Sequence, residues 1–95
     1  MPQPSSRPER FQPNPRVRLR ELADEAVLLD LESGTYYGLN ATGRRVWELL
    51  AGGHSLTATL ATMESELEVS AATLRADVEA LLSDLERAGL LARID

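Results

Sequence analysis

Alternating apolar and polar residues predict three strands in the first half of the chain. Residues 16–22 (RVRLREL) carry Val17 and Leu19 on one face and arginines on the other, which is typical of a half-buried strand. Residues 26–32 and 35–39 also have strand composition, and the Ser-Gly pair between them supplies the small residues of a tight hairpin. The pattern therefore predicts a three-stranded antiparallel meander.

After residue 39 the apolar period changes from that of a strand to that of a helix. Three helical segments follow, and the residues that cap their N-termini are Asn40 or Thr42, Ser55, and Ser70. The third helix has its core stripe at Leu74, Val78, Leu81 and Leu85 and ends at Gly89. Residues 90–94 add a terminal turn or a short strand. The predicted fold class is α+β, a three-stranded antiparallel meander followed by three helices, which is the element order of a winged helix-turn-helix with its sheet first.

The N-terminal segment differs in composition from the rest of the chain. All five prolines fall within residues 1–15. Proline lacks the backbone donor that helices and sheets use, so the sequence predicts a disordered or extended arm over residues 1–15. The folded domain is expected to cover residues 16–95, a single small domain.

Charge is distributed unevenly along the chain. Residues 1–20 carry a net charge of +4, and residues 21–95 carry −9, which together give the net charge of −5. An acidic domain repels the phosphate backbone that supplies most non-specific nucleic-acid affinity. Residues 70–88, which would be the recognition helix of a winged-helix DNA-binding protein, carry a net charge of −2. Nucleic acid is therefore not expected as a partner, although a DNA-binding function remains an alternative if the basic arm compensates.

The composition also argues against catalysis, metal binding and membrane insertion. The chain has no cysteine, and its single histidine, His54, follows two glycines in a loop with no partner for acid–base or metal chemistry. No apolar run approaches the length of a membrane span or of a signal peptide's apolar region. We expect a soluble, cytoplasmic, non-enzymatic protein with no catalytic residue, no metal and no cofactor.

Two segments together resemble a known family. They are VLLDLESGTYYGLNATGRRVWELL (residues 27–50) and LRADVEALLSDLERAGLL (residues 74–91). Their order and spacing are similar to the PqqD-like family of RiPP recognition elements, and most similar to the small stand-alone members of lasso-peptide biosynthesis. The resemblance covers residues 16–91, nearly the whole predicted domain.

The resemblance implies a peptide-binding function. Such domains bind the leader segment of a ribosomally made precursor peptide, which adds as a strand to the edge of the meander in the cleft between the third strand and the third helix. Lasso-type members present the leader to a leader peptidase, with a cyclase downstream. Members of pyrroloquinoline quinone pathways act instead as peptide chaperones for a radical SAM enzyme, and this remains an alternative.

The expected peptide-binding residues lie on the third strand and the third helix. They are Thr35, Tyr36, Tyr37, Gly38 and Leu39 on the strand, and Leu74, Arg75, Asp77, Val78, Leu81 and Leu82 on the helix. An open strand edge offers the backbone ladder that strand addition uses. On the helix, Leu82 lies off the core stripe, and Arg75 and Asp77 flank it and could pair with charged groups of a leader. The alternative is that Leu82 only widens the core stripe and that the two charged residues are solvated.

The three aromatic residues between positions 36 and 47 are expected to divide between core and contact. Tyr37 and Leu39 share a strand face and are assigned to the core, and Tyr36 points the opposite way and is the better candidate for contact. Trp47 lies on the first helix beside Val46, and burial of its large ring favours a core position.

Overall fold

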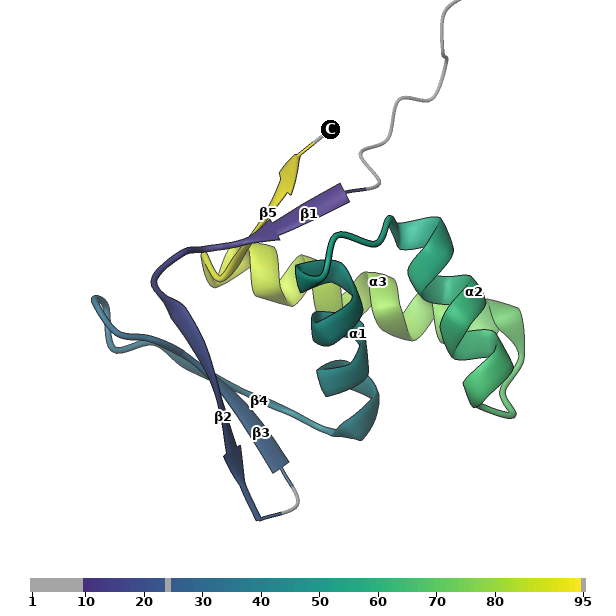
Figure 1. Cartoon of the computed structure of the whole chain (residues 1–95), viewed down its shortest axis with the longest axis horizontal. Coiled ribbons are helices and arrows are strands. Elements are labelled where there is room, and N and C mark those ends of the chain that lie inside the picture. The colour runs from purple at the N-terminus through teal and green to yellow at the C-terminus, as the bar shows by residue number, and fades with distance from the viewer. Residues whose placement is uncertain (1–9, 24, 95) are drawn as a thin grey trace, which may run out of the picture.

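The computed structural model describes residues 10–23 and 25–94. Five strands and three helices follow one another along these described residues (Figure 1). They are β1 (Arg10–Pro13), β2 (Val17–Leu22), β3 (Glu25–Asp30), β4 (Tyr36–Leu39), α1 (Ala41–Ala51), α2 (Leu56–Glu66), α3 (Ala71–Arg87) and β5 (Leu91–Ile94).

Strands β2, β3 and β4 form the antiparallel meander that the alternating pattern predicted. Leu28 of β3 lies opposite Tyr37 of β4 and opposite Leu19 of β2. Leu28 is fully buried, so this register directs the even-numbered residues of β3 and the odd-numbered residues of β2 and β4 towards the core. The predicted class, an α+β meander followed by three helices, is confirmed. The winged helix-turn-helix comparison describes only the element order.

Each helix begins at a residue whose side chain accepts a hydrogen bond from the first turn. Asn40 Oδ1 accepts from the Gly43 amide at 2.8 Å, which decides between the two candidate caps of α1. Ser55 and Ser70 cap α2 and α3 in the same way, each at 3.1 Å. Past the end of α3, Gly89 has a φ of +76°, a left-handed conformation that favours glycine. The predicted helix boundaries are confirmed.

The N-terminal segment corrects the predicted domain boundary. Residues 10–13 form β1, which pairs with β5 in a second, two-stranded antiparallel sheet. Phe11 is buried with 4% of its surface exposed, and the Arg93 guanidinium of β5 lies over its ring at 5.3 Å from the centroid. The expectation that the folded domain begins at Arg16 is therefore wrong, because β1 belongs to the core. The rest of the predicted arm, residues 1–9, lies outside the described residues.

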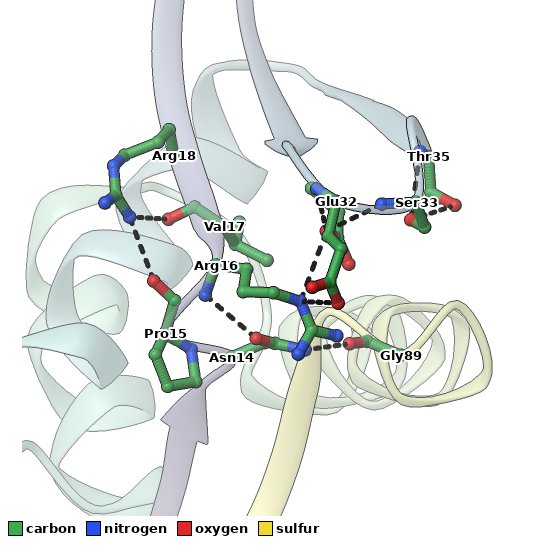
Figure 2. A network of polar contacts seen from close by, with 10 residues as sticks. Asn14, Pro15, Arg16, Val17, Arg18, Glu32, Ser33, Thr35 and Gly89 are labelled. Carbon is green, nitrogen blue, oxygen red and sulfur yellow. Dashed lines mark hydrogen bonds and ion pairs between the residues drawn. The ribbon is translucent and has the colours of Figure 1, made fainter.

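A polar junction joins the two sheets where β1 passes into β2. Asn14 contacts the end of α3 through its backbone amide, which donates to the Leu90 carbonyl at 3.0 Å, and its side-chain amide, which donates to the Gly89 carbonyl at 3.1 Å. Figure 2 shows the Arg16 side chain reaching from this junction to the β3–β4 turn, where its Nε lies 3.1 Å from Glu32 Oε1. The junction therefore sets how the β1–β5 sheet meets the meander.

Asp30 holds the turn that leads into β4. Its buried carboxylate accepts from the amides of Glu32 at 2.9 Å and Ser33 at 3.2 Å, and Arg16 Nε lies 3.6 Å away. These backbone hydrogen bonds, followed by the charge of Arg16, lower the pKa of Asp30 below its ordinary value. The ionised carboxylate therefore helps fix the position from which β4 starts.

The core lies between the meander and the helices. In Figure 1, α1 stands between the three-stranded sheet and α2. Val46 is fully buried, and only 7% of the surface of Trp47 is exposed to solvent. The assignment of Trp47 to the core is therefore confirmed. Asn40 alone separates β4 from α1, so α1 begins directly at the end of β4.

Candidate functional site

A cleft of about 260 Å³ opens where β4, the start of α1 and the middle of α3 meet. Its lining residues come from all three elements: Tyr37, Gly38, Leu39, Asn40, Thr42, Gly43, Val46, Asp77, Val78 and Leu81. Leucine and valine side chains line it together with polar groups, and β4 forms one wall.

The outer edge of β4 carries unpaired backbone groups. The Asp30 amide donates to the Thr35 carbonyl at 2.8 Å, so residues 35, 37 and 39 direct their backbone groups towards β3. The intervening residues, Tyr36 and Gly38, therefore direct their N–H and C=O groups away from the sheet. Within residues 10–23 and 25–94, β4 pairs only with β3, so this edge is open to another strand.

The second wall of the cleft is one face of α3. Asp77, Leu81 and Asp84 lie at i, i+4 and i+7 and so share this face. Tyr37 crosses from β4 and donates its hydroxyl hydrogen bond to Asp84 Oδ2 at 3.2 Å. Burial raises the pKa of Tyr37, and the neighbouring Asp84 carboxylate raises it further, so the phenol keeps its proton at neutral pH. This contact ties β4 to α3 beside the cleft.

The start of α1 closes the end of the cleft and depends on a glycine. A Cβ at Gly43 would lie 3.2 Å from Leu39 Cδ2 and 3.5 Å from Leu81 Cδ2. A side chain there would therefore crowd Leu39 and touch Leu81, and glycine lets α1 begin close to β4 and α3. The Asn40 side chain lies at the same corner as the cap of α1.

The structure brings together, around this cleft, about half of the residues that were predicted from the sequence to bind a peptide. Tyr37, Gly38, Leu39, Asp77, Val78 and Leu81 line the cleft. Tyr36, the first residue of β4, and Thr35, which precedes β4, lie outside it. The Tyr36 side chain is 71% exposed on the opposite sheet face, which agrees with its predicted outward direction. Tyr37 is half-buried rather than enclosed in the core, because its hydroxyl reaches Asp84.

Three nominated residues of α3 do not line the cleft. Leu74 and Leu82 are buried in the core with 2% and 1% of their surface exposed, and Arg75 pairs with Glu79 at 3.1 Å on the exposed side of the helix. The predicted core stripe is thus wrong at one position. Leu82 belongs to it, and Leu81 is the apolar residue that faces the cleft.

Four lining residues were not among the predicted peptide-binding residues: Asn40, Thr42, Gly43 and Val46. All four lie in the segment that joins β4 to α1, within the stretch that carried the family resemblance. The asparagine was identified as a helix cap, and the cap position itself was the signal that the helix starts at the mouth of the cleft. The glycine three residues later, inside a helix, was a second signal of close backbone approach.

Comparisons with known proteins agree with this geometry. Residues 25–91 match the family model described as coenzyme PQQ synthesis protein D (PqqD). This match spans most of the chain, and the chain therefore belongs to the PqqD family, as a PqqD-like RiPP recognition element. No match was found among curated proteins.

Two solved structures are similar to the chain over nearly their whole length. One is described as TbiB1 in complex with the TbiA(beta) leader peptide; it is 34% identical, with a TM-score of 0.76, and the match covers 84% of this chain and 93% of that one. The other is described as lasso peptide synthetase B1 complexed with the leader peptide; it is 31% identical, with a TM-score of 0.78, and the match covers 85% of this chain and 95% of that one.

Two other features are absent from the part of the chain that the structure describes. Over residues 10–23 and 25–94, no three histidine, cysteine, aspartate or glutamate residues are grouped so that they could hold a metal ion. In the same part of the chain, no helix is both long and apolar enough to cross a bilayer.

Proposed function

We propose that this chain is a non-catalytic RiPP recognition element that captures the leader segment of a lasso-peptide precursor and presents it to a leader peptidase. A leader strand adds to the open edge of β4 and lies in the cleft between β4 and α3. The observation that carries the proposal is this open edge beside a cleft, in a fold shared with two proteins whose structures contain leader peptides.

Strand addition divides recognition between backbone and side chains. The N–H and C=O groups of Tyr36 and Gly38 offer a ladder to any extended peptide, and this supplies affinity without reading sequence. Alternate side chains of the added strand then point into the cleft beside Tyr37 and Leu39, where the leader's identity is read. The remaining side chains of the added strand lie on the outer sheet face, next to Tyr36.

A binding assay with the natural peptide tests this function. A fluorescein-labelled synthetic leader, taken from the precursor gene beside this one, should bind saturably in fluorescence polarisation with a Kd in about the micromolar to nanomolar range. A scrambled leader of the same composition is the control for charge-driven association. Absence of saturable binding, or equal binding of the scrambled peptide, would exclude leader recognition.

The family name keeps one alternative open. Its description refers to coenzyme PQQ synthesis, so the chain could instead act as a peptide chaperone for a radical SAM enzyme. The adjacent reading frames and pull-downs with their products distinguish the two roles, since the lasso pathway requires a peptidase and a cyclase. Gel shifts at low salt with short duplexes test the winged-helix DNA-binding alternative, for which the acidic α3 offers little support.

A further inference from the structure

A carboxylate supplies the only formal charge among the described residues that line the cleft. That residue is Asp77, which lies on the α3 wall one turn before Leu81. Its side chain is exposed, and no hydrogen bond or ion pair joins it to another described residue. The remaining lining residues are apolar or neutral, so the cleft itself has nothing to balance this charge.

The arginines closest in sequence to the cleft lining are engaged elsewhere. Arg75 Nε lies 3.1 Å from Glu79 Oε2, one turn along the exposed side of α3. On α1, Arg44 contacts Glu21 and Glu48, and Arg45 contacts Glu48 and Glu66. These guanidinium groups are therefore held away from Asp77.

The rest of the α3 wall has the same sign. Leu81 lies between Asp77 and Asp84 on this face of α3. The Asp84 carboxylate accepts a hydrogen bond from the neutral Tyr37 hydroxyl, so its charge is not balanced by a cation there. A peptide strand along β4 thus faces an apolar side chain with a carboxylate on either side of it, and one of these carboxylates is unpaired. A leader segment with acidic side chains at this point would be repelled.

We propose that Asp77 is a specificity-determining residue, which selects leaders that place a lysine or arginine against α3. The aliphatic stem of that side chain would lie along Val78 and Leu81, and its cationic head would bind the Asp77 carboxylate. This inference rests on the proposed function, because it concerns a peptide bound at the same cleft.

The test compares two variants that remove one negative charge each. Asp77→Asn keeps the shape of the side chain, and Glu68→Gln makes the same charge change at an exposed residue that lies outside the cleft lining. With the labelled leader as the probe, Asp77→Asn should weaken binding about 2- to 5-fold, as expected for a partly exposed charged pair. Glu68→Gln should change it by less than about twofold, since only long-range charge is altered.

A second arm identifies the partner on the leader. Each lysine and arginine of the leader is replaced in turn by glutamine. One replacement should weaken binding to the unmodified protein as much as Asp77→Asn does, and should cause no further loss on the Asp77→Asn variant. Circular dichroism confirms that both protein variants are folded.

The outcomes separate this inference from the proposed function. If the unmodified protein binds the leader and Asp77→Asn binds it equally well, the role of Asp77 is refuted and leader recognition stands. The role of Asp77 is also refuted, with leader recognition intact, if no lysine or arginine of the leader is coupled to Asp77, or if the leader contains no lysine or arginine. If the unmodified protein does not bind the leader at all, both proposals fail.

Discussion

The open edge of β4 can be tested at a single backbone amide, that of Gly38. Its N–H points away from β3, whereas the N–H of Tyr37 is used in the β3–β4 ladder, so a change at Gly38, unlike one at Tyr37, removes an edge donor without breaking the meander. Proline is tolerated on edge strands where the N–H side faces solvent. Gly38→Pro should therefore fold and should bind the leader more weakly.

The expected loss follows from one backbone hydrogen bond. A lost hydrogen bond of this kind costs about 0.5–1.5 kcal/mol, and a leader carbonyl left unpaired beside the sheet raises the total to about 1–3 kcal/mol. At about 1.4 kcal/mol per tenfold change in Kd, affinity should fall about 5- to 150-fold. Fluorescence polarisation with the labelled leader measures this directly.

Gly38→Ala is the matched control. It keeps the N–H, and a Cβ at Gly38 would meet no atom within 4 Å, so the alanine variant should bind within about twofold of the unmodified protein. Circular dichroism and the emission of the buried Trp47 establish that each variant is folded. A folded Gly38→Pro variant with undiminished affinity would show that the leader binds at another surface.

Three further predictions concern the fold that positions the cleft. Phe11→Ala should lower the free energy of unfolding by about 3–5 kcal/mol in urea titrations followed by Trp47 emission, because the buried ring belongs to the core; an unchanged midpoint would show that β1 contributes nothing. Leu82→Ala should lower the free energy of unfolding by about 2–5 kcal/mol in the same assay. Leu81→Ala should lower it by less and should weaken leader binding more than Leu82→Ala does; the reverse ranking would contradict the assigned helix face. The lowered pKa of Asp30 means that its carboxylate stabilises the fold above the unfolded pKa of about 4, and that this contribution is lost as pH falls through the folded pKa. The Asp30→Asn variant should therefore be less stable at pH 7, and its free energy of unfolding should fall less steeply below about pH 5 than that of the unmodified protein. An equal pH dependence of the free energy of unfolding in the two proteins would contradict this role of Asp30.

Local pattern in the sequence was enough to predict most of the secondary structure. The alternation in residues 17–22 specifies a half-buried strand, and Asn40, Ser55 and Ser70 mark helix starts, because capping needs only a side chain and the next turn of backbone. The opposite directions of Tyr36 and Tyr37 follow from the period of a strand in the same way. These features depend on neighbours within a few residues, so the sequence alone determines them.

The tertiary structure decided what depends on residues far apart in the chain. Residues 10–13 are a poor strand by composition, yet they form β1 because β5, at the other end of the chain, supplies its hydrogen-bonding partner. Leu81 and Leu82 are adjacent on α3, and a helical period of 3.6 places both near the core stripe, so only packing against neighbouring elements such as α1, α2 and β5 determines which one is buried. The cleft likewise exists only because β4 and α3 are brought together, joined by the hydrogen bond from Tyr37 to Asp84.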